Sequence, residues 1–296
     1  MKNKLKYLAL LLILPVAFAF TGCGGGQLDG NAKVNTGKEA SYEAATMEDL
    51  TDYVATITEG DEAAVPTGAK ITVNFTAGAY ANGKVNVLFK VTEDEEENTN
   101  LEFAVRANVN YKDGDTAGKV KADLYYKDQV LYLDANVTGV DQETAAMVNG
   151  KQKLDLSEMG GIEGLLGMAM MFLPGDVTEE MPFDMAMLPE MFENFDLNVV
   201  LGLLDVIPVE FDVATYTDGD YTRFKLSAVD AETNDTIVAY LVFVQGVLAG
   251  VQVNAQMTEG EDVMSLAVAI EAFAGDIQYP NFNGYTEAQL PSEIIK

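Results

Sequence analysis

Apolar residues alternate with polar ones through most of this chain, and this period of two limits the fold more than any other feature. Alternating runs fill residues 71–156 and again residues 207–275. Because successive side chains of a β-strand point to opposite faces, each run predicts a strand with one buried and one wet face. Such strands are typical of antiparallel sheets, since the strands of parallel sheets are buried on both faces. The pattern therefore predicts two antiparallel meanders.

Turn-forming residues separate the runs. Asn82-Gly83 lies between two alternating runs and predicts a tight hairpin turn, because a type I′ turn needs positive φ at both central residues. Further turns are expected at 112–115, at Lys127-Asp128 and at 218–220. These boundaries predict about six strands in the first meander and about five in the second.

Two short helices are expected beside the meanders. Thr46 is a candidate N-cap, and apolar residues from Met47 to Ile57 recur at helical spacing after it. Asp141 is a candidate N-cap for a brief helix that ends near Asn149-Gly150.

Residues 157–206 interrupt the strand pattern with Leu, Met, Phe and Gly. Nine of the 13 methionines fall between Met147 and Met191, and Met packs adaptably against varied apolar partners. Apolar residues at helical spacing predict Met-rich helices, and charged residues break every run long enough to span a membrane. These helices are either an ordinary cover for the sheet or one wall of an apolar ligand site. The candidate ligand contacts are Leu165, Leu166, Met168, Met171, Phe172, Met187, Met191, Phe192 and Phe195.

The N-terminus has the layout of an export signal. Lys2, Lys4 and Lys6 precede an apolar run that ends before the sole cysteine, Cys23. Thr21-Gly22-Cys23 resembles a bacterial lipobox, which implies lipidation of Cys23 and cleavage before it. An ordinary signal peptide with an incidental cysteine is the alternative. The expected divisions are therefore a signal peptide over 1–22, a lipidated cysteine and flexible tether over 23–40, and a single β-rich domain over 41–296.

Composition argues against several classes of function. The chain has a net charge of −29, which disfavours nucleic acid because phosphate binding needs clustered Lys and Arg. It has no His, the commonest general base and metal ligand near neutral pH. The acidic stretches 93–97, 113–115 and 218–220 lack the ligand spacing of an EF-hand loop. We therefore expect no enzyme activity, catalytic residue, cofactor or metal site.

The order of these elements resembles the LppX/LprG-type lipid-carrier lipoproteins and, more distantly, the LolA/LolB fold. The most similar phrases are the Tyr-rich run 124–132 and the run 149–156. The resemblance implies an α+β, predominantly antiparallel fold, with a strongly curved sheet or half-barrel of about 11 strands covered by the mid-chain helices. It also implies a non-enzymatic protein of the bacterial cell envelope, anchored to the membrane through Cys23 and holding a lipid or other apolar ligand. The alternative is a surface interaction or structural lipoprotein with a solid core and an unidentified protein partner.

Overall fold

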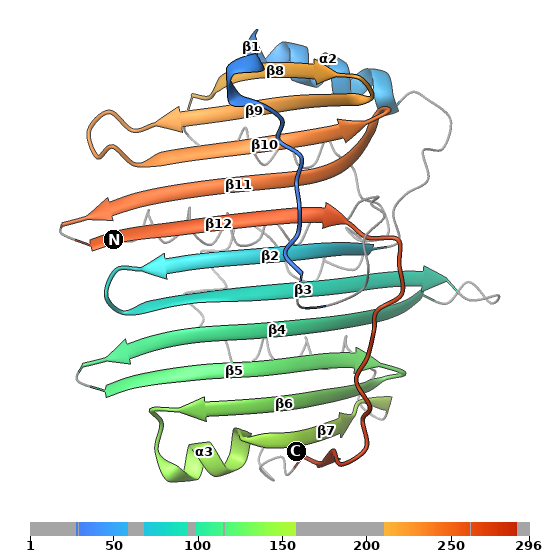
Figure 1. Ribbon diagram of the computed structural model, residues 1–296, viewed down its shortest axis with the longest axis vertical. Helices are drawn as coiled ribbons and strands as arrows, with labels where there is room; N and C mark the ends of the chain where they lie inside the picture. Colours follow the sequence, from blue (N-terminus) through green and yellow to red (C-terminus); the bar gives the residue numbers. More distant parts are fainter. Residues whose placement is uncertain are drawn as a thin grey trace.

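A single open sheet dominates the computed structural model, which describes Leu28 and residues 30–58, 68–93, 99–114, 116–157, 210–260 and 262–288. Thirteen strands lie in the order β1-β8-β9-β10-β11-β12-β2-β3-β4-β5-β6-β7-β13, and the two ends of this series do not pair with each other (Figure 1). Every neighbouring pair is antiparallel except β7 and β13. The predicted antiparallel architecture is thus confirmed.

Eleven of the strands are long and correspond to the two predicted meanders. They are β2 (Gly68–Ala77), β3 (Ala81–Glu93), β4 (Thr99–Asp113), β5 (Thr116–Lys127), β6 (Val130–Thr138), β7 (Gly150–Asp155), β8 (Asp212–Asp218), β9 (Tyr221–Val229), β10 (Thr236–Val244), β11 (Val247–Glu259) and β12 (Asp262–Ala272). The remaining two, β1 (Glu43–Ala45) and β13 (Thr286–Glu287), occupy the edges of the sheet. Edge strands this short limit the length over which another chain can pair.

Pairing of β2 with β12 joins the two meanders into one sheet. Nine residue pairs connect these strands, from Met264 opposite Ala77 to Ala272 opposite Ala69. All other long-strand pairs are between consecutive strands of one meander. Residues almost 200 positions apart in the chain therefore share one hydrogen-bonded ladder.

The described helices begin where the sequence predicts. In α2 (Met47–Thr58), the Asp49 amide donates to Thr46 Oγ1 at 3.1 Å, and the Thr46 amide donates to Asp49 Oδ2 at 2.7 Å. This reciprocal arrangement satisfies two amides that the helix itself leaves unpaired. In α3 (Gln142–Val148), Asp141 Oδ1 accepts the amides of Glu143 and Thr144. The predicted helices over 157–206 lie outside the described residues.

One face of the sheet, here called the apolar face, carries an unbroken row of aliphatic and aromatic side chains. In register, the row is Phe224, Leu241, Val251, Ile270, Ile71, Val87, Val105, Leu124 and Leu133. The helix α2 covers one end of this face, where Leu50 and Val54 are fully buried in the same cluster as Leu241. The Tyr53 ring lies 5.4 Å from that of Phe224 and 5.1 Å from that of Phe243.

Residues 30–42, here called the strap, lie on the opposite, polar face together with Leu28. Figure 1 shows this segment crossing the sheet from β8 towards β3, and the C-terminal residues 273–287 running from β12 to β7 beside it. Leu28 packs with Leu88, Phe273 and Ile277, and it is only 7% exposed. The Ala32 amide donates to Thr72 Oγ1 at 2.8 Å. Of the segment expected to be a flexible tether, Leu28 and residues 30–40 lie against the sheet, where Leu28 and Ala32 are buried and Val34 is half-buried.

The predicted hairpin turn at Asn82-Gly83 is wrong. The turn comprises residues 78–80, with Gly78 at a φ of +53°, and Asn82 and Gly83 lie within β3. A Cβ on Gly83 would lie 2.9 Å from the Phe75 ring and 2.9 Å from Val109 Cγ2. The glycine therefore provides space for a neighbouring aromatic ring rather than a turn conformation. The other predicted turns are confirmed, including Asp128 and Gln129 at positive φ between β5 and β6.

Replacing Gly83 with Ala should lower the free energy of unfolding by about 1–3 kcal/mol, because the added methyl group overpacks a filled site. The same substitution in a Phe75→Leu background should cost clearly less, since the ring it would meet is gone. Urea denaturation of the four proteins gives the coupling between the two positions. Equal losses in both backgrounds would instead indicate that the contact with Val109 Cγ2, rather than the Phe75 ring, decides the cost.

Candidate functional site

Polar side chains form a regular grid on the polar face where β2, β3, β4 and β5 lie side by side. Two register rows make up the grid, and their members alternate with the apolar residues of the same strands. The first row is Asn74, Lys84, Asn108, Lys121 and Asn136, and the second is Thr76, Asn82, Asn110, Lys119 and Thr138. No Asp or Glu belongs to either row across these strands and β6.

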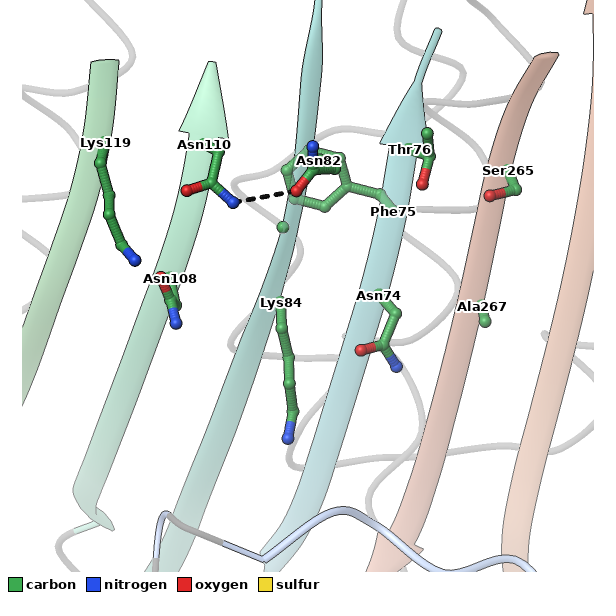
Figure 2. Close-up of a pocket in the computed structure, with 11 residues that line it drawn as sticks. Asn74, Phe75, Thr76, Asn82, Lys84, Asn108, Asn110, Lys119, Ser265 and Ala267 are labelled. Atoms are coloured by element: carbon green, nitrogen blue, oxygen red, sulfur yellow. Dashed lines mark hydrogen bonds between the residues drawn. The ribbon is translucent and has the colours of Figure 1, made fainter. Parts of the chain in front are cut away.

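A shallow depression of about 410 Å³ lies over this grid and extends onto β12 through Ser265 and Ala267. Figure 2 shows amide and ammonium groups from β2, β3, β4 and β5 around it. The Asn110 side-chain amide donates to Asn82 Oδ1 at 3.0 Å, and Lys84 donates to Asn31 Oδ1 of the strap. In the described part of the chain, the side chains of Asn74, Asn108 and Lys119 make no hydrogen bond. These groups are free to bind a ligand.

The lysines of the grid have no acidic partner among the described residues, whereas five other basic residues have one. Five ion pairs connect described residues, and they are Lys90–Asp276, Arg106–Asp123, Lys151–Asp134, Lys153–Glu287 and Lys225–Glu39. Within the described ranges, Lys84, Lys119 and Lys121 take part in none of them. Asp123 shares its strand and face with Lys121, but it binds Arg106 through two bonds of 2.6 and 2.7 Å.

The apolar face changes in exposure along a single register row. Phe224, Leu241, Val251, Ile270 and Ile71 are all at most 5% exposed. The rest of the row, Val87, Val105, Leu124 and Leu133, is only half-buried although the side chains are equally apolar. The helix α2 packs over the β8–β11 end of the sheet, and the buried part of the row continues beyond it through Ile270 on β12 and Ile71 on β2. The β3–β6 end of the row is thus an apolar wall of which part remains accessible.

Arg223 fixes the strap to the polar face of β9. Its guanidinium is only 2% exposed, and Nε donates to the Asn35 carbonyl at 2.7 Å. The guanidinium carbon lies 5.0 Å from the Tyr216 ring centroid and 4.7 Å from that of Tyr221. Cation–π contacts of this kind stabilise a charge that burial would otherwise destabilise. Nη1 is buried and has no hydrogen-bond partner within the described structure.

Tyrosines and one carboxylate complete the attachment of the strap. Tyr42 Oη donates to the Thr36 carbonyl at 2.7 Å, and its ring lies 5.7 Å from that of Tyr216. Burial raises the pKa of the Tyr42 phenol to about 12. Glu39 accepts hydrogen bonds from Lys225 and from Tyr240, and the bond from Lys225 is the main cause that lowers the pKa of the Glu39 carboxyl.

The C-terminal segment covers the other end of the polar face through aromatic contacts. Phe282 stacks on Tyr132 with ring centroids 3.7 Å apart, and it also contacts Tyr125, Tyr279 and Tyr285. Burial raises the pKa of the Tyr285 phenol to about 12 and also raises that of Tyr279. The strap and this segment leave the grid beside the β2–β3 turn uncovered.

The residues that the sequence singles out for function lie outside the described residues. They are Cys23, Leu165, Leu166, Met168, Met171, Phe172, Met187, Met191, Phe192 and Phe195. Within the described ranges, no three His, Cys, Asp or Glu side chains are grouped as a metal ion would require. None of the helices described is long and apolar enough to cross a membrane.

Comparison of the chain with protein families, curated proteins and solved structures finds no match.

Sequence reasoning did not identify the polar grid. Its members are the wet positions of correctly predicted strands, so each residue alone is an ordinary exposed Asn, Thr or Lys. The register between four strands brings them together. The available signal was the excess of Asn and Lys over Asp and Glu at these wet positions in a strongly acidic chain.

Ionisation of the Tyr42 phenol should lower the free energy of unfolding at high pH. Its folded-state pKa of about 12 lies above the ordinary tyrosine value of 10.0, so the folded protein retains the phenolic proton more tightly than the unfolded chain. This contribution is complete below about pH 10 and is lost as the pH rises towards about 12. The Tyr42→Phe variant should be less stable than the wild type by about 1 kcal/mol near pH 8, because the bond to Thr36 is lost. Urea denaturation between about pH 8 and pH 12 should show the difference in free energy of unfolding between the wild type and Tyr42→Phe becoming smaller as the pH rises. A difference that stays constant would contradict the raised pKa of Tyr42.

Proposed function

We propose that this protein is a non-enzymatic, lipid-anchored protein of the bacterial cell envelope that holds a hydrophobic ligand, such as a lipid, against the apolar face of its sheet. The observation that carries the proposal is the change in exposure along one register row. Aliphatic side chains that are fully buried between β9 and β2 are only half-buried from Val87 to Leu133.

The energetics of that row favour an apolar occupant. Removing apolar surface from water stabilises by about 25 cal/mol per Å². Val87, Val105, Leu124 and Leu133 are adjacent in register, so their accessible surfaces form one continuous patch rather than scattered exposed residues. Contiguous apolar surface is a feature of ligand and interaction sites. A ligand chain lying across these strands would remove this surface from water.

The second wall of the site is proposed to come from the helices that the sequence predicts over residues 157–206. Their Leu, Met and Phe residues supply the adaptable apolar surface that a flexible hydrocarbon ligand requires. In this arrangement the thirteen-stranded sheet corresponds to the half-barrel of the lipid carriers that the chain resembles. The Met-rich segment would cover the apolar face of that sheet.

The strap gives the proposed anchor a short reach. If Cys23 carries the lipid, Leu28, which is buried on the polar face, follows it by only five positions. Five extended residues span at most about 18 Å. The sheet would therefore stay close to the membrane surface, which suits a protein that exchanges an apolar ligand with that membrane.

A ligand-retention experiment tests the proposal. The chain beginning at Gly24, which keeps the strap, would be purified from a lipid-rich bacterial host without detergent. We expect native mass spectrometry and solvent extraction to find a stoichiometric apolar molecule. The Leu124→Glu variant should retain at least tenfold less of it, because a carboxylate on this wall would be desolvated by the ligand.

The matched control is Asn136→Glu, which places the same charge on the polar face of the neighbouring strand. This variant should retain the ligand, and circular dichroism would confirm that both variants fold. A ligand-free wild type that also takes up no offered phospholipid or fatty acid would contradict the proposal. That result would favour an envelope interaction protein with a solid core.

A further inference from the structure

We propose that the polar grid on β2–β5 is a second binding site, and that its ligand is an acidic glycan, a sugar chain bearing carboxylate groups. The site lies on the face opposite the proposed hydrophobic-ligand wall, so the two can be occupied together. Three independent features carry this inference: unpaired positive charge, a set of free amides, and an uncovered depression.

The charge of the grid is unusual for this chain. The protein has 47 acidic residues against 18 basic ones, yet Lys84, Lys119 and Lys121 lie together without an acidic partner among the described residues. Lys112 continues the same face of β4 beyond Asn110 and is likewise absent from every described ion pair. Keeping like charges adjacent is unfavourable, and an anion bound between them would offset that repulsion. The ligand should therefore carry negative charge.

The amides indicate what else the ligand presents. Each Asn side chain offers two N–H donors and a carbonyl acceptor, so it can bond a hydroxyl group as donor and acceptor at once. Asn74, Asn82, Asn108 and Asn110 are all exposed and project from three adjacent strands (Figure 2). Neighbouring strands are about 4.8 Å apart and alternate residues about 6.8 Å apart, which spreads these groups over a regular lattice. A polyhydroxylated chain provides matching groups along its length.

An exposed aromatic residue lies at the end of the lattice. Tyr80 is 64% exposed in the β2–β3 turn, and its carbonyl accepts the Lys112 amide at 2.7 Å. A tyrosine ring presents an apolar face and a polar hydroxyl, the combination that packs against the C–H face of a sugar ring. Tyr80 is one of the few large apolar side chains exposed in the described structure, and it lies two residues before Asn82 of the grid.

Other anionic partners fit the grid less well. Single-stranded nucleic acid binds through aromatic platforms for successive bases, and the one aromatic residue that lines the depression, Phe75, lies beside Gly83 and belongs to the apolar face of β2. A membrane surface binds proteins whose lysines are accompanied by apolar side chains that insert into it. Among the residues that line the depression, Ala267 is the sole apolar residue on the polar face. A protein partner would require a buried aromatic or aliphatic anchor, which the two rows do not provide.

Binding of polygalacturonate tests the inference, with the chain from Gly24 as the protein and isothermal titration calorimetry as the measurement. We expect saturable binding that weakens with added NaCl, and at least tenfold weaker binding of the neutral glycan dextran. The triple variant Lys84→Gln, Lys119→Gln, Lys121→Gln should bind polygalacturonate at least tenfold more weakly than the wild type. A control triple variant, Lys33→Gln, Lys38→Gln, Lys127→Gln, loses the same charge outside the grid and should bind normally.

A double variant distinguishes recognition of a glycan from a general attraction for anions. Asn108→Ala combined with Asn74→Ala removes hydroxyl partners without changing charge, and it should weaken polygalacturonate binding several-fold while leaving the slope of affinity against salt unchanged. Equal binding of DNA or of phosphatidylglycerol vesicles would overturn the glycan assignment in favour of an unspecific anionic surface. No binding of polygalacturonate, or equal loss in the grid and control triple variants, would overturn the site itself. These readouts do not depend on whether a hydrophobic ligand is present.

Discussion

The nine-residue pairing between β2 and β12 is the interaction on which the rest of the structure depends. It places the last long strand of the second meander beside the first long strand of the first, so that two local meanders become one sheet. It also aligns their alternation, because Ile270 lies opposite Ile71 and Thr72 lies opposite Ala269. A shift of one residue in this register would turn the apolar side chains of one meander to the polar face of the other. The observed register gives the sheet one continuous apolar face and places Ser265 and Ala267 of β12 at the edge of the depression over the polar grid.

Local signals in the sequence were sufficient for the strands, the helix caps and most turns. Thr46 and Asp141 cap their helices because each side chain accepts amides that only the local backbone offers. Gly114 follows β4 and Gly219 follows β8, and both adopt the positive φ that is typical of tight turns. Asn82-Gly83 carries the same local signal but lies within a strand. Gly83 is needed there because the Phe75 ring of the neighbouring strand occupies the space where a side chain at position 83 would lie. Local chemistry cannot report such a contact.

Long-range pairing explains what the sequence did not reveal. The strap is polar and rich in Gly and Asn, yet Arg223 and Asn86, far along the chain, bond its carbonyl groups at Asn35 and Leu28. The polar grid likewise exists only once four strands are in register. The candidate contacts in 157–206 rest on composition and helical spacing, and they stay predictions.

The two faces of one sheet are thus assigned two kinds of ligand. The half-buried row from Val87 to Leu133 is the proposed wall for a hydrophobic molecule, and the grid behind it presents amides and ammonium groups to solvent. The strap and Leu28 lie on the polar face and are hydrogen-bonded to β2, β3 and β9. An anchored chain of this form would hold its lipid-facing wall near a membrane.

Methyl NMR with a spin-labelled fatty acid tests the apolar wall most directly. The proposed function predicts that 16-doxyl stearate broadens the methyl signals of Val87, Val105, Leu124 and Leu133 and leaves those of Leu226, Leu241 and Val251 sharp, since α2 buries that end of the face. Broadening that is absent, or that is equal at both ends of the face, would contradict a ligand site on this wall.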